Sequence, residues 1–425
     1  MARDICQVRQ INARTFLPAP FFRIWGDKTL PMVYSIALMH IITTTKDLEN
    51  ACQALASAEY LTVDTEFMRD STYWPKLCLI QIAGPQDAFI IDPLSPDLEL
   101  TAFYDLLRME TAVKVFHAAR QDLEIFFHDG GVIPKPLFDT QVAAMACGFG
   151  DSVGYDNLVQ NLTNVHIDKS SRFSDWSRRP LSKQLLEYAM GDVTHLRNVY
   201  EILHEQLRST GREDWLSEEM GILSSPSTYN LDPRDAWKRL KLRNMKQSRL
   251  GILVEVAAWR ETQAQSRNVP RQRVVRDDAL SEIVSRRPNN SRDLEEMRGL
   301  PKGFSRSKAA SSLLDAVQRG TNTPPENLPR IEKPAKIINK NSALLELLKV
   351  LLKLQCERFN VAQKLVASMA DLAQIATQDN ASVPALSGWR ADVFGESALK
   401  LKRGEIAVSL KNQELVLVPV PPGGN

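Results

Sequence analysis

The chain has 425 residues, of which 44% are hydrophobic and 24% charged, and its formal net charge is +2. This composition is that of a soluble globular protein, and the length predicts two or three domains rather than one. No apolar run approaches the ~18 residues of a membrane span and no segment has the layout of a cleaved secretion signal, so we expect no membrane partner.

Residues 1–40 form a basic segment that contains few acids. A targeting peptide has such a composition. The alternative is a poorly ordered extension or an upstream start codon, with Met32 or Met39 as the true first residue. We assign no chemistry to this segment.

From residue 41 to residue 225 the apolar runs predict a mixed α/β domain. Short runs separated by polar residues, Gly or Pro predict strands at 60–67, 78–83, 88–91 and 113–117. Longer periodic stretches predict helices at 97–109, 120–127, 140–147, 155–162 and 182–206. Strands followed by alternating helices predict a sheet flanked by helices.

The first predicted strand carries two acids. Asp64 and Glu66 lie two residues apart in an alternating run, so a strand would point both carboxylates from the same face. Adjacent buried carboxylates are tolerated when they are protonated, paired or bound to cations, and oxygen ligands on a rigid strand suit Mg²⁺ or Mn²⁺. A metal site is the simplest explanation.

Two further segments supply acids. Tyr188 and Asp192 are four residues apart in a predicted helix, which places them one turn apart on one face. Asp122 follows the predicted strand end at His117 and begins the next helix. Acids at strand ends and on facing helices can converge on one cleft. Considered alone, Asp122 could instead be a helix N-terminal acid favoured by the helix dipole.

The order of these three motifs resembles the DEDD exonuclease superfamily, in the subgroup with Tyr in the last motif. Similarity to the bacterial ribonuclease D family extends into the surrounding residues 63–81, 90–94, 116–126, 138–141 and 175–181. This resemblance implies a ribonuclease-H-like fold for residues 41–225. It also implies a 3′-to-5′ exoribonuclease that releases nucleoside monophosphates from RNA 3′ ends, with tRNA precursors as the expected partners.

The resemblance further implies roles for the motif residues. Asp64, Glu66, Asp122 and Asp192 would hold two divalent ions, Mg²⁺ or Mn²⁺, with Asp64 bridging them. Such a pair stabilises both the attacking and the leaving oxygen at phosphorus. Tyr188, with an unperturbed pKa of about 10, is better suited to orient a water molecule than to act as a free base at neutral pH.

Other residues are candidates for substrate binding. Phe67 and Met68 could form an apolar wall against the terminal base, and His117 would, by resemblance, contact the terminal sugar or phosphate. Each could equally be a structural residue. A loop that mixes cations with an aromatic side chain could clamp the RNA backbone or be merely solvated; it contains Lys169, Arg172, Trp176, Arg178 and Arg179.

Opposite charges separate along the chain. Residues 40–225 carry 15 Lys and Arg against 28 Asp and Glu, whereas the remainder carries 38 against 23. An acidic segment that approaches a polyanion needs bound cations at its site and basic neighbours that attract the substrate. This division is typical of a nuclease.

Residues 226–320 resemble an HRDC domain, the small helical bundle shared by RecQ helicases and ribonuclease D. Within them, residues 234–276 hold 12 Lys and Arg against 3 Asp and Glu, with Trp237 and Trp259 interleaved. This excess of positive charge favours phosphate binding over a solvated helix face. We expect Asp277 to cap the helix that starts there.

Residues 335–425 predict an amphipathic helix at 342–356 and further helices, and they weakly resemble a second, degenerate HRDC-like domain. Such a domain could bind RNA or only pack against the others. The expected fold class is therefore an α/β ribonuclease-H-like exonuclease domain with a mixed sheet, followed by one or two all-α HRDC-type bundles. Five scattered cysteines without zinc spacing favour a reduced, cytoplasmic protein, which we expect to be monomeric.

Two alternative functions remain open from the sequence. A DNA 3′-to-5′ exonuclease of the same superfamily would use the same acids, since no residue visibly reads a 2′-hydroxyl group. A catalytically inactive RNA-binding protein would use only the helical bundles. All five motif residues are intact, which counts against the inactive protein.

Overall fold

A computed structural model describes residues 41–172, 174–240, 247–329 and 342–421 of the chain. Residues 1–40, for which we expected a targeting peptide or an extension, lie outside the described residues. So do residues 330–341. No helix among the described residues is both long enough and apolar enough to cross a membrane.

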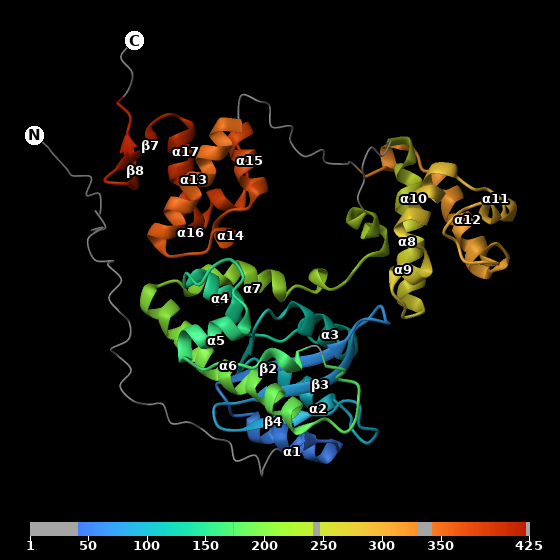
Figure 1. Cartoon of the computed structure of the whole chain (residues 1–425), viewed down its shortest axis with the longest axis horizontal. Coiled ribbons are helices and arrows are strands. Elements are labelled where there is room, and N and C mark those ends of the chain that lie inside the picture. The colour runs from blue at the N-terminus through green and yellow to red at the C-terminus, as the bar shows by residue number, and fades with distance from the viewer. Residues whose placement is uncertain (1–40, 173, 241–246, 330–341, 422–425) are drawn as a thin grey trace, which may run out of the picture. The chain divides into compact units, whose positions relative to one another are not determined.

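A six-stranded mixed sheet forms the centre of the first domain (Figure 1). Its order is β1-β4-β3-β2-β5-β6, with β2/β3 and β3/β4 antiparallel and the other pairs parallel. The strands are β1 (Ile41–Ile42), β2 (Tyr60–Met68), β3 (Lys76–Ala83), β4 (Ala88–Ile91), β5 (Val113–Phe116) and β6 (Leu137–Asp139). The predicted mixed sheet is confirmed.

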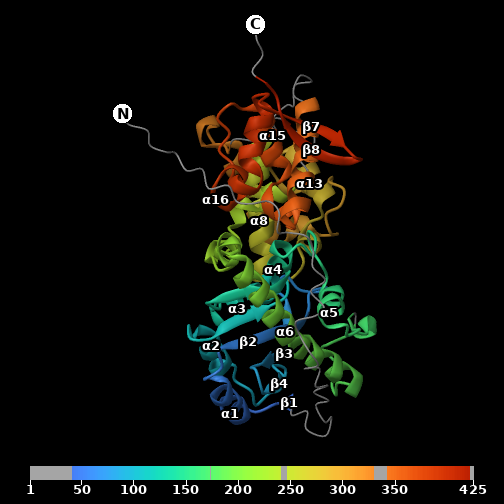
Figure 2. The same ribbon diagram turned by 90° about the vertical axis from the view of Figure 1, so that its left-hand side faces the viewer.

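Helices cover both faces of this sheet. Buried apolar residues of α1 (Thr45–Leu55), α2 (Thr101–Arg108) and α3 (Arg120–Gly130) pack on one face. The other face packs against α4 (Thr140–Ala146), α5 (Tyr155–Thr163) and α6 (Lys183–Thr210). Figure 2 shows α6 running beside β2 and β3, both of which it contacts.

The ends of α6 follow from its sequence. The Ser182 side chain caps the first turn by accepting a hydrogen bond from the Leu185 amide. Gly211 ends the helix with a φ of 65°, a left-handed conformation that costs glycine little. Because both signals are local, the predicted helix at 182–206 is confirmed to within a turn.

Residues after α6 form a helical region. A short helix α7 (Ser217–Leu223) and a 3₁₀ helix (Pro233–Arg239) lead into α8 (Leu250–Ser266), α9 (Arg271–Val274), α10 (Asp277–Arg286), α11 (Ser291–Glu295) and α12 (Lys308–Thr321). Helix α8 is buried on almost every side because the other elements of this bundle pack around it.

Two sequence expectations for this bundle are corrected. Trp237 and Trp259 are each only 7% exposed and belong to the apolar core, so their rings are not interleaved with surface cations. Asp277 is the first residue of α10, whose N-cap is Arg276, and it makes no cap. Its carboxylate instead accepts a 2.6 Å hydrogen bond from Arg260, a buried guanidinium that needs a counter-charge.

The C-terminal region departs from the all-helical expectation. It contains α13 (Ser342–Phe359), α14 (Gln363–Val366), α15 (Met369–Thr377), α16 (Gly388–Arg390) and α17 (Glu396–Lys402). A two-stranded antiparallel hairpin of β7 (Ile406–Lys411) and β8 (Glu414–Pro419) follows. Asn412 and Gln413 turn the chain with φ of 53° and 66°, the conformation that a two-residue hairpin turn requires.

Candidate active site

Strand β2 presents its two acids toward α6. Leu61 and Val63 face the apolar core on one side, while Thr62, Asp64 and Glu66 alternate onto the other side. The Thr62 hydroxyl donates a 2.9 Å hydrogen bond to the Val193 carbonyl of α6. This bond ties the strand to the helical turn that carries the last acid.

Three of the four predicted acids form one cluster. Single carboxylate oxygens of Asp64, Glu66 and Asp192 all lie within 4.8 Å of one another. Asp192 is 7% exposed, and the two strand acids are half-buried. Oxygen donors this close on two rigid elements suit a divalent cation such as Mg²⁺ or Mn²⁺.

Asp122 lies beside this cluster rather than within it. It is the third residue of α3, it is 7% exposed, and its carboxylate accepts a hydrogen bond from the Thr65 hydroxyl. Its charge still contributes to raising the pKa of Glu66. The four acids therefore share one electrostatic environment, although only three carboxylates approach one another closely.

Burial raises the pKa of every acid in the site, and repulsion from neighbouring acids adds to this for Asp64, Glu66 and Asp122. Burial and the nearby Asp64, Asp192 and Asp122 raise the pKa of Glu66 to about 10. Burial raises the pKa of Asp192 to about 8. The pKa values of Asp64 and Asp122 are raised by burial first and by a neighbouring aspartate second. A cation that displaces these protons would relieve the repulsion, so the residues fit a metal site.

Tyr188 stands one turn before Asp192 on α6. Burial and the charges of Asp192, Glu66 and Asp64 raise the pKa of its phenol. The hydroxyl group therefore stays protonated at neutral pH and acts as a hydrogen-bond donor.

Trp176 is 2% exposed, with its ring 6.2 Å from the Tyr188 ring. The sequence placed Trp176 on a surface facing RNA, but in the structure its ring supports Tyr188 from within the protein.

The segment before α3 is held in an uncommon conformation. Ala118 has a φ of 59°, a left-handed conformation that is strained for a residue with a Cβ atom. The two carboxylate oxygens of Asp139 accept hydrogen bonds of 3.0 and 2.9 Å from the Ala118 and Ala119 amides. Asp139 thereby fixes the start of the helix that carries Asp122.

His117 lies partly buried next to this segment. Its Nδ1 atom is 2.9 Å from the Thr140 hydroxyl, which itself donates to the Phe116 carbonyl. Because that hydroxyl has a single hydrogen, we infer that Nδ1 carries the proton and that Nε2 is the acceptor. Burial lowers the His117 pKa, which favours the neutral ring.

The remaining predicted substrate residues differ in burial and in their partners. Phe67 and Met68 are half-buried and follow Glu66 directly, where a bulge interrupts the β2/β3 register. Arg172 is exposed, and its positive charge opposes the raised pKa values of Glu66 and Tyr188. Two other cations of the loop are paired locally: Lys169 with Asp156 at 2.6 Å and Arg178 with Asp175 at 3.0 Å.

Sequence reasoning missed two supports of the site. Arg179 forms two 2.6 Å hydrogen bonds to Asp92 at the end of β4 and donates to the Cys78 carbonyl, which anchors the loop after Trp176. Tyr155 of α5 donates a 2.7 Å hydrogen bond to the Asp192 carbonyl. Both contacts join residues far apart in sequence, so no local pattern could reveal them.

Domain-family comparisons match two parts of the chain. A 3′–5′ exonuclease model matches residues 39–208, and an HRDC domain model matches residues 249–317. Together with the mixed sheet and the acidic cluster, these matches define the class: a 3′–5′ exonuclease domain followed by a helical HRDC region.

Relatives named ribonuclease D resemble almost the whole chain. The protein from Nitrobacter hamburgensis is 50% identical over 380 residues, which cover 89% of this chain and 99% of the relative. The protein from Granulibacter bethesdensis is 48% identical over 379 residues, covering 89% and 96%.

Solved structures agree with these relatives. Escherichia coli RNase D, described as an exoribonuclease involved in structured RNA processing, has a TM-score of 0.74 and 27% identity, covering 86% of this chain and 98% of its own. A protein from Bifidobacterium adolescentis shares the fold with a TM-score of 0.64 at 19% identity, covering 86% of this chain and 97% of its own. The chain therefore belongs to the ribonuclease D family and is a 3′–5′ exoribonuclease. The predicted family, fold class and activity are confirmed.

Proposed function

We propose that the chain trims the 3′ ends of structured RNAs, tRNA precursors among them, with two divalent cations at Asp64, Glu66, Asp122 and Asp192. The observation that carries this proposal is the approach of three carboxylates to within 4.8 Å of one another. Preference for structured RNA is supported by the similarity to Escherichia coli RNase D, an exoribonuclease involved in structured RNA processing.

The four acids would hold the cations, which supply a lowered pKa for the attacking water and neutralise charge on the leaving 3′-oxygen. The protonated hydroxyl of Tyr188 donates a hydrogen bond that orients this water. Asp122 would join this ligand set through the carboxylate that accepts the hydrogen bond from the Thr65 hydroxyl. In this proposal Tyr188 orients the attacking water and does not act as a base.

Substrate contacts surround the acids. Phe67 and Met68 offer an apolar wall for the terminal base, which suits an enzyme that must accept any nucleotide. A contact from His117 to the terminal sugar or phosphate would require its Nε2 atom, which is buried among the described residues, to become accessible. The charge of exposed Arg172 opposes the raised pKa of Glu66, so Arg172 would bind a phosphate near the scissile bond.

The loop that follows has two further cations. Lys169 and Arg178 would exchange their present carboxylate partners for backbone phosphates of the RNA. We assign catalysis to residues 41–225 and RNA binding to the basic residues 234–276 of the HRDC region at 226–320, and leave residues 335–425 with a supporting role. We propose that the protein works as a cytoplasmic monomer, which light scattering and fractionation would test.

The experiment compares three substrates under one condition. A 3′-extended tRNA, an unstructured RNA of the same 3′ sequence and the matching DNA are each incubated with full-length protein and Mg²⁺ or Mn²⁺. We expect stepwise shortening of both RNAs, faster at limiting enzyme for the extended tRNA, and slow or no shortening of the DNA. Equal rates on RNA and DNA would instead favour the DNA exonuclease, and equal rates on both RNAs would refute the preference for structure.

A further inference from the structure

A cavity lined by arginines lies where the exonuclease domain meets the helical region. Its volume is about 270 Å³. The lining comes from the end of β2, the start of α3, the chain after α7 and the start of α9, and consists of Arg69, Arg120, Glu124, Thr228, Tyr229, Leu231, Arg239 and Arg271. Four guanidinium groups against one carboxylate leave this lining with an excess of positive charge.

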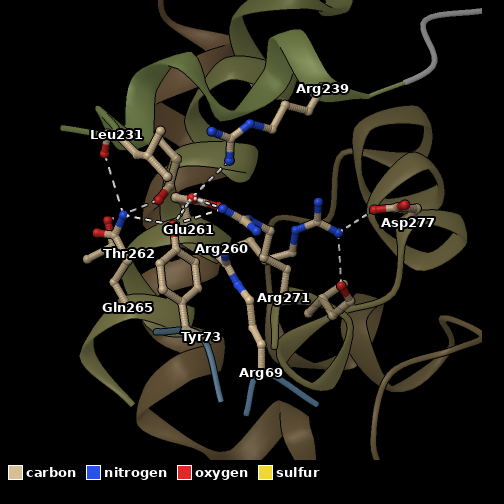
Figure 3. A network of polar contacts seen from close by, with 12 residues as sticks. Arg69, Tyr73, Leu231, Arg239, Arg260, Glu261, Thr262, Gln265, Arg271 and Asp277 are labelled. Carbon is tan, nitrogen blue, oxygen red and sulfur yellow. Dashed lines mark hydrogen bonds and ion pairs between the residues drawn. The ribbon is translucent and has the colours of Figure 1, made fainter. Parts of the chain in front are cut away.

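Two of the four arginines are neutralised by neighbouring acids. Arg69 forms hydrogen bonds of 2.8 and 2.9 Å to the two carboxylate oxygens of Glu124. Arg271 bonds to Glu261 at 2.5 and 2.6 Å and to the Tyr73 hydroxyl at 2.8 Å. Figure 3 shows Arg271 and Arg239 converging on Glu261, beside Tyr73. These pairs fix the shape of the cavity. The positive charges of the other two arginines, Arg120 and Arg239, are left over.

The other two arginines keep donors available. Arg239 reaches Glu261 only at 3.5 Å, and its side chain is 49% exposed. Arg120 is exposed and makes no hydrogen bond or ion pair within the described ranges. A planar guanidinium offers paired donors that match the oxygens of a phosphate. The cavity therefore has the charge and the donor geometry for one phosphate group.

The position of the cavity separates it from the acidic cluster. Arg120 and Asp122 begin the same helix and are two residues apart, which places them about 200° apart around its axis and about 3 Å apart along it. A phosphate bound in the cavity would therefore lie on a different face of α3 from the scissile bond. The same polyanion can reach both places if its 3′ end enters the acidic site.

We propose that this arginine cavity binds a backbone phosphate in the body of the RNA, upstream of the nucleotides that enter the acidic site. The inference rests on the proposed function, because it takes the ligand to be the RNA being trimmed. It adds a contact formed jointly by the exonuclease domain and the helical region, so that only an RNA longer than the catalytic cleft can use it.

The test measures RNA binding without catalysis. Full-length protein in EDTA is titrated with fluorescent 3′-extended tRNA and with a hexanucleotide of the same 3′ sequence, at several salt concentrations. Arg239→Gln removes a guanidinium that is held only by a 3.5 Å contact to Glu261, and Arg239→Lys keeps the charge. Arg292→Gln is the matched control, since the Arg292 side chain is 88% exposed in the same helical region and lies 3.9 Å from Glu296.

We expect Arg239→Gln to weaken tRNA binding about three- to tenfold at low salt and to reduce the salt slope of log K by about 0.7 to 0.9, with a smaller loss for the hexanucleotide. Arg239→Lys should retain the slope, and Arg292→Gln should match the parent. A tRNA slope for Arg239→Gln equal to that of the parent would overturn the proposal. A second result would also overturn it: inorganic phosphate stabilises the parent but not Arg239→Gln, while the two proteins bind RNA equally well. That result would assign the cavity to a free anion.

These outcomes are separable from the proposed function. A parent that binds tRNA with the expected slope but shortens no RNA would contradict the catalytic proposal and leave the cavity assignment standing. A parent that trims RNA while Arg239→Gln binds normally would contradict only the cavity assignment.

Discussion

The Tyr155 hydroxyl donates a 2.7 Å hydrogen bond to the main-chain carbonyl of Asp192, within a helix that already uses its own carbonyls for backbone bonds. The same hydroxyl lies 3.3 Å from the Gly191 carbonyl. Tyr155 thus holds the turn of α6 that presents the last acid of the site, and it acts as a positioning residue.

Replacing Tyr155 with Phe should lower kcat several-fold while leaving KM for RNA within about twofold, because the acid shifts but the substrate surface does not. Loss of the bond should also reduce the free energy of unfolding by about 1 kcal/mol. Steady-state kinetics and urea unfolding measure the two effects.

Tyr104→Phe is the matched control for this prediction. The buried Tyr104 hydroxyl has no hydrogen-bond partner within the described part of the chain, so its removal should leave both kcat and stability unchanged or slightly improved. Equal kinetics for the two variants would show that the Tyr155 bond does not position Asp192.

The raised pKa values of the acids predict that metal-free protein loses stability as pH rises from about 4 to the folded pKa values of about 8 to 10. An acid whose pKa is higher in the folded than in the unfolded protein stabilises folding fully below its unfolded value, near about 4 for Asp. That contribution disappears as pH rises through the folded value, which is about 8 for Asp192 and about 10 for Glu66. Added Mg²⁺ should therefore raise Tm little at pH 6 and more at pH 9.

The corresponding variant is Asp192→Asn. It removes a charge from the buried cluster, so metal-free protein should gain about 1 kcal/mol of stability at pH 8 and show a flatter dependence of Tm on pH. The Mg²⁺-induced increase in Tm should also shrink. Thermal unfolding in EDTA and in Mg²⁺ from pH 6 to 9 measures this, and an unchanged pH dependence would refute the assignment of the raised pKa values.

The Arg179 and Asp92 pair predicts a defect in substrate binding rather than in chemistry. Arg179→Lys cannot make the paired hydrogen bonds, so the loop that contains Arg172 and Arg178 should be less well ordered. We expect KM for RNA to rise several-fold and kcat to fall less. Arg208→Gln, which breaks only a surface pair with Glu205, should behave as the parent; a fall in kcat alone would contradict this role.

Buried Glu261 joins the two regions of the chain. It is 1% exposed and is bound by Arg271 and by Tyr73, which lies between β2 and β3. Removing its charge leaves Arg271 unpaired, so Glu261→Gln should cost about 3 kcal/mol. Calorimetry should then resolve separate unfolding of the exonuclease domain and the helical region. A single transition with an unchanged Tm would show that Glu261 does not couple them.

Local signals made most of the exonuclease fold predictable. The alternation around Asp64 and Glu66 fixed their common face, and the spacing of Tyr188 and Asp192 fixed their common turn. The alternating pattern of β2 did not reveal that both of its faces are covered. Thr62 is fully buried, because α6 covers the face that carries the acids. The resemblance to a known family supplied the pairing of these segments, which spacing alone does not give.

Long-range contacts limited the prediction elsewhere. Trp237 and Trp259 occur among arginines in sequence, yet helix packing turns their rings inward, and Asp277 is drawn to Arg260 rather than to a helix terminus. The missed hairpin had a weak signal, since the strand-length runs 406–411 and 414–419 are separated by only two residues, the first of which is Asn412.

The central claim is that four acids from three segments hold a pair of divalent cations. Mn²⁺ binding to metal-free, full-length protein, followed by calorimetry and electron paramagnetic resonance, tests it most directly. We predict two bound ions per chain with a spin-coupled signal, and loss of that signal in Asp64→Asn although the protein stays folded. One uncoupled ion in the parent, or an unchanged coupled pair in Asp64→Asn, would contradict the account.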